Sequence, residues 1–212
     1  MIRSTNAGER RTYRHGDLKR ALLEAGVELA RLGGPQAVVL REATRRAGVV
    51  PNAAYRHFAS HRELMSAVRA AALSALAMAM EDELAGLPRG GKPKDLARAC
   101  LRAVGAGYLR FARDEPGLFR TAAAFGEEDR AGDPAKAGRS GLNPFELLCA
   151  ALDRFVDAGL LPADQRPGAE YLAWSAVHGM AMLVMDGPLR GLPDAQLRPL
   201  GQRLLQMVEK GL

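Results

Sequence analysis

Residues 47–58 read AGVVPNAAYRHF, and the fold can be worked out from this stretch. Gly48 interrupts a helical pattern and can adopt the left-handed turn conformation that a residue with a Cβ atom resists. Pro51 suits the first turn of a helix, where its missing N–H costs nothing. Two short helices, expected over residues 40–47 and 51–58, are thus joined through a glycine, which is the arrangement of a helix-turn-helix.

The second of these helices carries side chains suited to DNA. Asn52 and Ala53 are small and let the backbone approach a major groove, whereas Tyr55 and His57 point towards a phosphate strand. The interruption at Gly48 therefore allows the second helix to be presented to DNA.

Positive charge is concentrated in the same part of the chain. The net charge of the 212 residues is +6. Residues 1–69 contain 13 Lys and Arg against 6 Asp and Glu, whereas the other 143 residues contain 17 against 18. This segregation predicts a basic nucleic-acid module joined to a neutral module with another task.

Apolar residues recur at helical spacing along the rest of the sequence, and no segment alternates with period two. Further helices are expected over 17–32, 61–84, 94–114, 116–125, 144–158, 168–186 and 194–210. Pro199 should delay or distort the start of the last one. We therefore expect an all-α protein of about nine helices. Its predicted parts are a flexible basic arm over residues 1–15, a helix-turn-helix DNA-binding domain over 16–62, and a ligand-binding and dimerisation domain over 63–212.

The stretch at 40–68, LREATRRAGVVPNAAYRHFASHRELMSAV, resembles the DNA-binding signature of the TetR family of one-component transcriptional regulators. Residues 13–38 resemble the first helix of that family. The segment YLAWSAVHGMAML (171–183) is similar to the Trp-x-x-x-His-Gly part of a C-terminal regulatory domain in one branch of the family. The resemblance implies a homodimer that binds a near-palindromic operator, with a long fourth helix coupling a ligand pocket to the spacing of two reading heads.

The resemblance also implies which residues contact DNA. Arg41 should reach a base or a phosphate. His61 stands where the family usually has a phosphate-binding Lys, and it is a weaker, pH-dependent substitute. The full expected set consists of Arg41, Arg45, Arg56 and His61, of Pro51, Asn52 and Ala53 at base edges, and of Tyr55 and His57 on the DNA backbone. Val39 and Val50 depart from the Ser or Thr that usually caps helices 2 and 3, a loss worth about 0.5–2 kcal/mol.

Other interpretations of these residues stay open. The arginines could form only a solvated face, and Tyr55 could be a core aromatic with a wet hydroxyl. His57 and His61 have the i, i+4 spacing of metal ligands on a helix, but the remaining parts of a zinc motif are missing. We expect no metal and no cofactor. Because no GxSxG, HExxH, P-loop or dinucleotide-binding motif is present, we do not expect an enzyme.

An aromatic stripe in the second part of the chain is the candidate ligand site. The stripe lies on the helix expected over 168–186 and consists of Tyr171, Trp174, Ser175, His178 and Met182. It is either core or one wall of a mainly apolar pocket with a few polar groups. The opposite wall would come from Tyr108, Phe111 and Phe119. Gly105 and Gly107 would leave room for the bound molecule.

These features predict a ligand-responsive transcriptional regulator, a repressor that binds double-stranded operator DNA as a homodimer. No cluster of Arg or Lys lies on the faces of the candidate pocket, so the effector that releases the DNA should be small and mainly apolar. The alternative is an architectural or recruiting DNA-binding protein without a ligand. Such a protein has no need for a neutral, aromatic-lined helical domain.

The dimer is expected to form through the last two helices. Small residues would allow a close helix neighbour on one of them, and these are Ala173, Ala176 and Gly179. The other would contribute an apolar seam at Leu197, Gly201, Leu204 and Val208. The longest apolar run, residues 172–185, is too short to span a bilayer, and the N-terminus has no secretory signal. We therefore expect no membrane partner and a cytoplasmic, nucleoid-associated protein.

Overall fold

The computed structural model describes residues 15–50, 54–88, 90–124 and 132–212. Within these ranges the chain forms eight α-helices and two short 3-10 helices without any strand, which confirms the all-α expectation. The α-helices are α1 (His15–Gly33), α2 (Leu40–Arg46), α4 (His61–Ala85), α5 (Pro93–Asp114), α6 (Pro116–Ala123), α7 (Pro144–Asp157), α8 (Ala169–Met185) and α9 (Asp194–Gly211). The 3-10 helices are η1 (Pro35–Ala37) and η2 (Pro134–Lys136).

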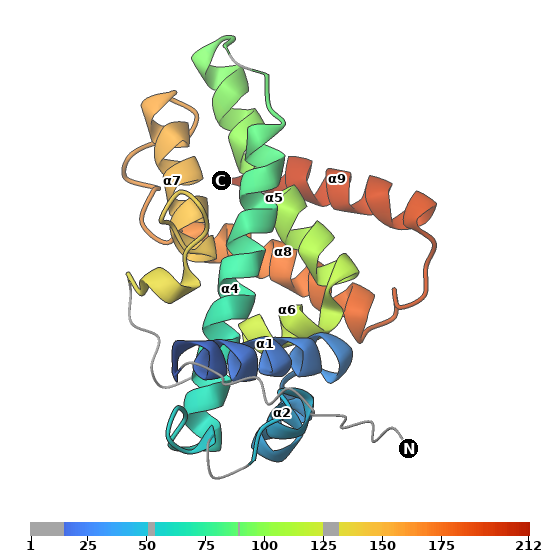
Figure 1. Cartoon of the computed structure of the whole chain (residues 1–212). Helices are drawn as coiled ribbons and strands as arrows, with labels where there is room; N and C mark the ends of the chain where they lie inside the picture. The colour runs from blue at the N-terminus through green and yellow to red at the C-terminus, as the bar shows by residue number, and fades with distance from the viewer. Residues whose placement is uncertain (1–14, 51–53, 89, 125–131) are drawn as a thin grey trace, which may run out of the picture.

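The long helix α4 is the axis of the molecule, and the other helices are arranged along it (Figure 1). Near its first residues it packs against α1, where the Leu64 and Val68 side chains lie beside Gly26. Further along it packs against α5, α6 and α7. Among the described residues α4 is also the one helix long and apolar enough to cross a membrane. Its packing on four neighbouring helices makes it a core helix of this fold.

The α4–α5 crossing is unusually close because α5 carries a glycine there. A Cβ atom added to Gly107 would lie 2.5 Å from the Cα atom of Met80. Gly105, two residues earlier in sequence, is covered by a side chain of α9, since a Cβ atom there would lie 2.3 Å from Leu205 Cδ2. Both glycines therefore accommodate neighbouring helices, and the expectation that they leave room for a bound molecule is wrong.

The helix ends follow their local sequence. Asn143 caps α7, with its side chain accepting from the Glu146 N–H at 3.0 Å and the Glu146 carboxylate accepting from the Asn143 N–H at 2.8 Å. Val39 precedes α2 and makes no side-chain capping hydrogen bond, as its apolar side chain requires. Helix α9 begins at Asp194 and continues through Pro199, so this proline does not delay the helix.

Candidate nucleic-acid interface and regulatory cluster

The turn after α2 has the conformation that its glycine predicts. Gly48 has a φ of 68°, in the left-handed region that glycine adopts without steric cost. The next residue, Val49, packs against the core, and its N–H donates to the Thr44 carbonyl oxygen at 3.0 Å. The chain therefore leaves α2 in a fixed direction, held from inside by an apolar side chain.

Beyond this turn, two buried side chains anchor the chain and leave Tyr55 and Arg56, which lie between them, facing outward. Ala54 and Phe58 are buried, and the N–H groups of His57 and Phe58 both donate to the Ala54 carbonyl oxygen at 2.9 Å. Tyr55 is 57% exposed and Arg56 is also exposed. Tyr55 is thus a surface residue, and its interpretation as a core aromatic is wrong.

Several residues of the predicted interface lie outside the described part of the chain. These are Pro51, Asn52 and Ala53, together with residues 1–14 of the basic arm. Their assignment to base edges and to DNA grooves stays a prediction.

The basic face of α2 contains a carboxylate that sequence reasoning did not take into account. Arg41 and Arg45 are exposed, and they stand one helical turn apart on α2. Arg45 forms a bidentate pair with Glu42, from Nε to Oε2 at 2.8 Å and from Nη2 to Oε1 at 2.6 Å. Arg46 Nε also donates to Glu42 Oε1, at 3.3 Å. The Glu-x-x-Arg-Arg spacing in the sequence is the signal that would have revealed this cluster.

His61 has a structural partner at the start of α4. Its Nε2 atom lies 2.6 Å from the carbonyl oxygen of Val38, which makes this nitrogen the donor. A phosphate contact of His61 would have to come from the other ring nitrogen, Nδ1, and it stays a prediction.

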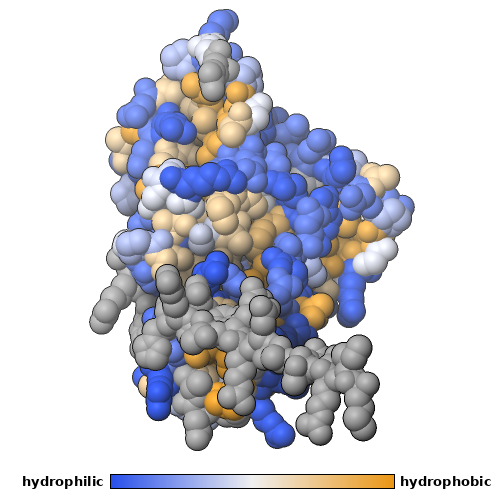
Figure 2. Space-filling view, in the orientation of Figure 1, coloured by the Kyte–Doolittle hydropathy of each residue, from blue (hydrophilic) through white to orange (hydrophobic). Residues whose placement is uncertain are grey.

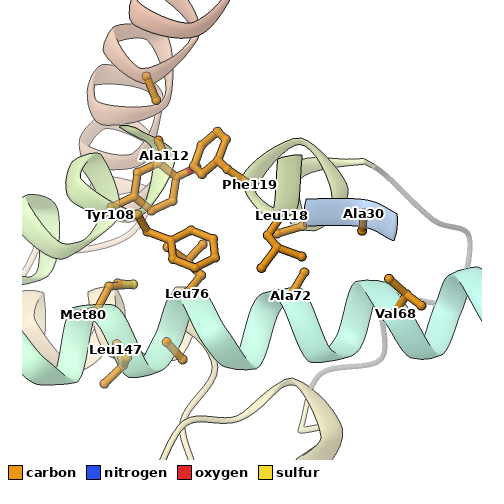
Figure 3. Packing of buried hydrophobic residues seen from close by; sticks show 14 of the residues in the cluster. Ala30, Val68, Ala72, Leu76, Met80, Tyr108, Ala112, Leu118, Phe119 and Leu147 are labelled. Atoms are coloured by element: carbon orange, nitrogen blue, oxygen red, sulfur yellow. The ribbon is translucent and has the colours of Figure 1, made fainter. Parts of the chain in front are cut away.

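In the other half of the molecule, four aromatic rings from three helices form a compact cluster. Tyr108 of α5 lies edge-on to Phe119 of α6, with ring centroids 5.1 Å apart. Phe119 stacks on His178 of α8 at 5.9 Å, and Trp174 lies 6.2 Å from His178. Figure 3 shows the Tyr108 and Phe119 rings side by side above α4.

Hydrogen bonds fix the protonation of this cluster. Trp174 Nε1, which can only donate, lies 3.1 Å from the Tyr108 hydroxyl. The Tyr108 hydroxyl proton is then available for His178 Nδ1 at 2.9 Å. Burial raises the pKa of Tyr108 to about 12 and lowers the pKa of His178. Both groups are therefore neutral at physiological pH. Trp174 donates to Tyr108 and Tyr108 donates to His178, so each of the three side chains has a hydrogen-bond partner.

This arrangement predicts that the protein loses stability in mild acid through His178. Because burial lowers the pKa of His178, the unfolded chain binds this proton more tightly than the folded one. The stability that the neutral ring contributes to the folded state is fully present above the ordinary His pKa, about 6.5. It is lost as the pH falls below that value. We expect the melting temperature to fall more between pH 7.5 and pH 5.5 in the parent protein than in His178→Gln, measured by circular dichroism. Equal decreases would contradict this account.

The predicted ligand-binding stripe is divided between the core and the surface. Tyr108, Phe111 and Phe119 are buried, and Trp174 and His178 are half-buried against them. Tyr171 and Met182 are 60% and 38% exposed. Ser175 is also exposed, and its hydroxyl donates to the Leu172 carbonyl oxygen at 2.9 Å. The cluster thus has an inner part closed by its own side chains and an outer edge open to solvent.

Two hollows of the molecule lie away from this stripe. One of about 650 Å³ is bounded by α4, α5 and α9, with Leu87, Arg102 and Gln206 among its lining residues. The other, of about 490 Å³, is bounded by α4, α5, α7 and the turn that includes Arg139 and Ser140. The Glu81 carboxylate holds this turn by accepting from the N–H groups of both residues at 2.8 Å.

Helix α6 connects the aromatic cluster to the helix-turn-helix half of the chain. Its Phe119 belongs to the cluster, and its Leu118 points towards α4 (Figure 3). On its other side, Gly117 touches the last turns of α1 so closely that a Cβ atom would lie 2.3 Å from the Ala30 and Arg31 carbonyl oxygens. Arg31 Nε donates to Glu115 Oε2 at 2.9 Å across the same contact. A displacement of α6 would therefore act directly on α1.

The opposite edge of α6 is tied to the end of α8. Arg120 donates to both carboxylate oxygens of Asp186, with Nη2 at 2.5 Å and Nε at 3.2 Å. The guanidinium of Arg120 is the main reason that the pKa of Asp186 is lowered, so this pair stays charged over the physiological range. Through α6, movements of α8 can reach the helix-turn-helix half.

Helices α8 and α9 expose apolar side chains in positions adjacent to those expected. Leu172 and Leu183 of α8 are 65% and 44% exposed, and Met207 of α9 is 61% exposed. Among the expected seam residues, Leu204 and Val208 are half-buried and pack partly against the core of their own chain, whereas Gly179 of α8 has open space beside it. Ala173 is buried, and a Cβ atom at Gly201 would contact Leu109 at 3.5 Å. The seam therefore stays a prediction. Figure 2 shows apolar surface on the side of the molecule where α8 and α9 lie.

Comparison with known proteins agrees with this division into a helix-turn-helix half and a helical regulatory half. Solved structures share the fold along nearly the whole chain. A protein of unknown function from Rhodococcus sp. RHA1 has a TM-score of 0.73 at 23% identity, covering 96% of this chain and 99% of its own. The TetR family transcriptional regulator PfmR from Thermus thermophilus has a TM-score of 0.56 at 23% identity, covering 90% and 98%. A TetR-like transcriptional regulator from Rhodococcus sp. RHA1 has a TM-score of 0.53 at 19% identity, covering 95% and 98%.

Sequence comparison gives the family. No curated protein matches this sequence. The model of the family described as "Bacterial regulatory proteins, tetR family" matches residues 22–68. This range includes α2, the Gly48 turn and the exposed Tyr55. The description "Tetracyclin repressor-like, C-terminal domain" matches residues 101–208, just over half of the chain, from α5 to α9. With the turn, the exposed basic face and the aromatic cluster all inside these two matched ranges, the chain belongs to the TetR family of DNA-binding transcriptional regulators.

Proposed function

We propose that this protein is a one-component repressor that binds a near-palindromic operator as a homodimer and is released by a small, mainly apolar effector. In this proposal residues 16–62 read DNA, and residues 63–212 bind the effector and dimerise in the cytoplasm. The observation that carries it is α6, which touches the aromatic cluster at Phe119 and the DNA-binding half at Gly117. An architectural protein without a ligand would not need that connection, and no enzymatic step is part of the proposal.

The effector would bind at the outer edge of the aromatic cluster. Tyr171 is exposed there, near the half-buried Trp174, and Met182 is exposed about two helical turns further along α8. Phe145 of α7 extends the edge, with its ring centroid 5.8 Å from that of Tyr171. A planar or aliphatic molecule that opened this edge would separate Trp174 from Tyr108 and displace Phe119. A ligand can shift the equilibrium only by its difference in affinity for the two arrangements, so it must favour the opened one.

The experiment that tests the proposal has two steps. The purified protein is incubated with fragmented DNA of its own genome, and bound fragments are sequenced to obtain the operator. Operator release is then measured for small apolar compounds that raise the melting temperature. Release by such a compound in the parent protein, but not in Trp174→Ala, supports the proposal. Stabilisation of Trp174→Ala by the same amount would place the effector site elsewhere.

DNA binding should depend strongly on salt through the exposed arginines. Each phosphate contact adds about 0.9 to the slope of log affinity against log salt concentration. Arg56 is exposed beside Tyr55, so Arg56→Gln should flatten this slope by about one, measured by fluorescence anisotropy. Arg190→Gln removes the same charge between α8 and α9 and should leave the slope unchanged. An unchanged slope in Arg56→Gln would remove Arg56 from the interface.

A further inference from the structure

Glu42 is a negatively charged side chain inside the basic face of α2. Its two carboxylate oxygens accept three hydrogen bonds, two from Arg45 at 2.8 and 2.6 Å and one from Arg46 at 3.3 Å. Side-chain exposure is 73% for Arg45 and 33% for Glu42, so the pair lies at the surface and can be reached by DNA. The hydrogen bonds from Arg45 are the main reason that the pKa of Glu42 falls to about 2, and Glu42 is therefore ionised at any pH at which DNA is bound.

The geometry of this pair matters because Glu42 occupies one of the two edges of the Arg45 guanidinium that can bind a phosphate. A guanidinium binds phosphate in a bidentate way through two parallel N–H groups. Arg45 already directs its Nε and Nη2 atoms to Glu42. A DNA phosphate can take this pair of donors only by displacing the carboxylate.

We propose that Glu42 is a specificity-determining residue, an internal competitor that keeps Arg45 from binding phosphates of non-operator DNA. In a non-operator complex the protein has no fixed register, so no phosphate is held where it could displace the carboxylate. In the operator complex, base contacts fix the register and a phosphate replaces Glu42 on Arg45. The inference rests on the proposed DNA-binding function and assigns to it a residue that reduces non-specific binding.

The two kinds of complex then respond differently when the charge of Glu42 is removed. Non-operator DNA gains one phosphate contact, which at 0.1 M salt corresponds to about an eightfold increase in affinity. Operator DNA already has that contact. Its affinity should rise only about two- to threefold, because the exposed ion pair no longer has to be broken. The specificity ratio should therefore fall by about threefold.

The test compares Glu42→Gln with the parent protein on a random-sequence duplex and on the selected operator, by anisotropy over a series of salt concentrations. We expect the slope for the random duplex to steepen by about 0.9 and the slope for the operator to stay unchanged. Glu209→Gln is the matched control, because Glu209 also joins two arginines, Arg98 and Arg102, but between α5 and α9. It should change neither slope.

A second variant separates release of Arg45 from a general change of charge. In the double variant Glu42→Gln with Arg45→Gln, the gain on random DNA should disappear relative to Arg45→Gln alone. A gain of the same size in both backgrounds overturns the inference, as does an unchanged random-duplex affinity in Glu42→Gln. If the parent protein binds neither duplex, the proposed function fails as well, whereas failure of the Glu42 variants alone leaves that function standing.

Discussion

Gly117→Ala is expected to lower the free energy of unfolding by about 3 kcal/mol, because α6 and α1 meet backbone to backbone at this residue. The added Cβ atom would lie 2.3 Å from two carbonyl oxygens, those of Ala30 and Arg31, and neither can move without bending α1. The helices must separate to admit the methyl group, and the Arg31–Glu115 pair across the contact would separate with them. Chemical denaturation at a fixed protein concentration measures the loss.

The matched control for this variant is Gly201→Ala in α9. A Cβ atom there would meet Leu109 at 3.5 Å, an ordinary contact. Alanine also favours the helix over glycine by about 1 kcal/mol, so Gly201→Ala should be neutral or slightly stabilising. Hydrogen exchange should show faster exchange of α1 amides in Gly117→Ala only. Wild-type stability and wild-type protection of α1 in that variant would mean that α6 does not hold α1.

The sequence was sufficient to predict the fold because the deciding features are local. Gly48 and the apolar spacing of α4 each act within one or two helical turns, and both are present in the structure. The exposure of Tyr55 agrees with the expectation that it faces DNA, and Ala54 and Phe58 are the buried residues on either side of it.

The candidate site was harder to predict because it depends on contacts between distant segments. Helical spacing places Trp174 and His178 on one stripe, but it cannot tell whether Tyr108 fills the space opposite them. Gly105 and Gly107 look like room for a ligand in the sequence, yet Leu205 and the α4 backbone occupy that room.

The faces of α8 and α9 raise the same difficulty for the dimer. Both helices are apolar on more than one side, and only the packed structure distinguishes the inner side from the outer one. In α9, Leu204 and Val208 pack partly against the core, whereas Leu200 and Met207 beside them are exposed. The seam expected from spacing therefore stays a prediction, and Leu200 is an exposed apolar residue one helical turn from Leu204 on the same helix.

The second large effect is expected from Leu200→Arg, which should lose the dimer. Leu200 is 38% exposed on the outer side of α9, where a partner's apolar side chains would pack against it. Burying the charge of an arginine in a desolvated apolar interface costs far more than the leucine contact contributes. We expect Leu200→Arg to be monomeric at micromolar concentration by light scattering.

Loss of the dimer should reduce operator affinity by a hundredfold or more. Two linked reading heads bind with the effective concentration of an intramolecular event, which contributes about 10²- to 10⁴-fold, and a monomer retains only one half-site. Leu96→Arg is the matched control, because Leu96 is also 38% exposed but lies on α5. It should remain dimeric and bind the operator normally. If Leu200→Arg and Leu96→Arg behave alike, the outer side of α9 is not the interface, and the two reading heads must be joined through another surface.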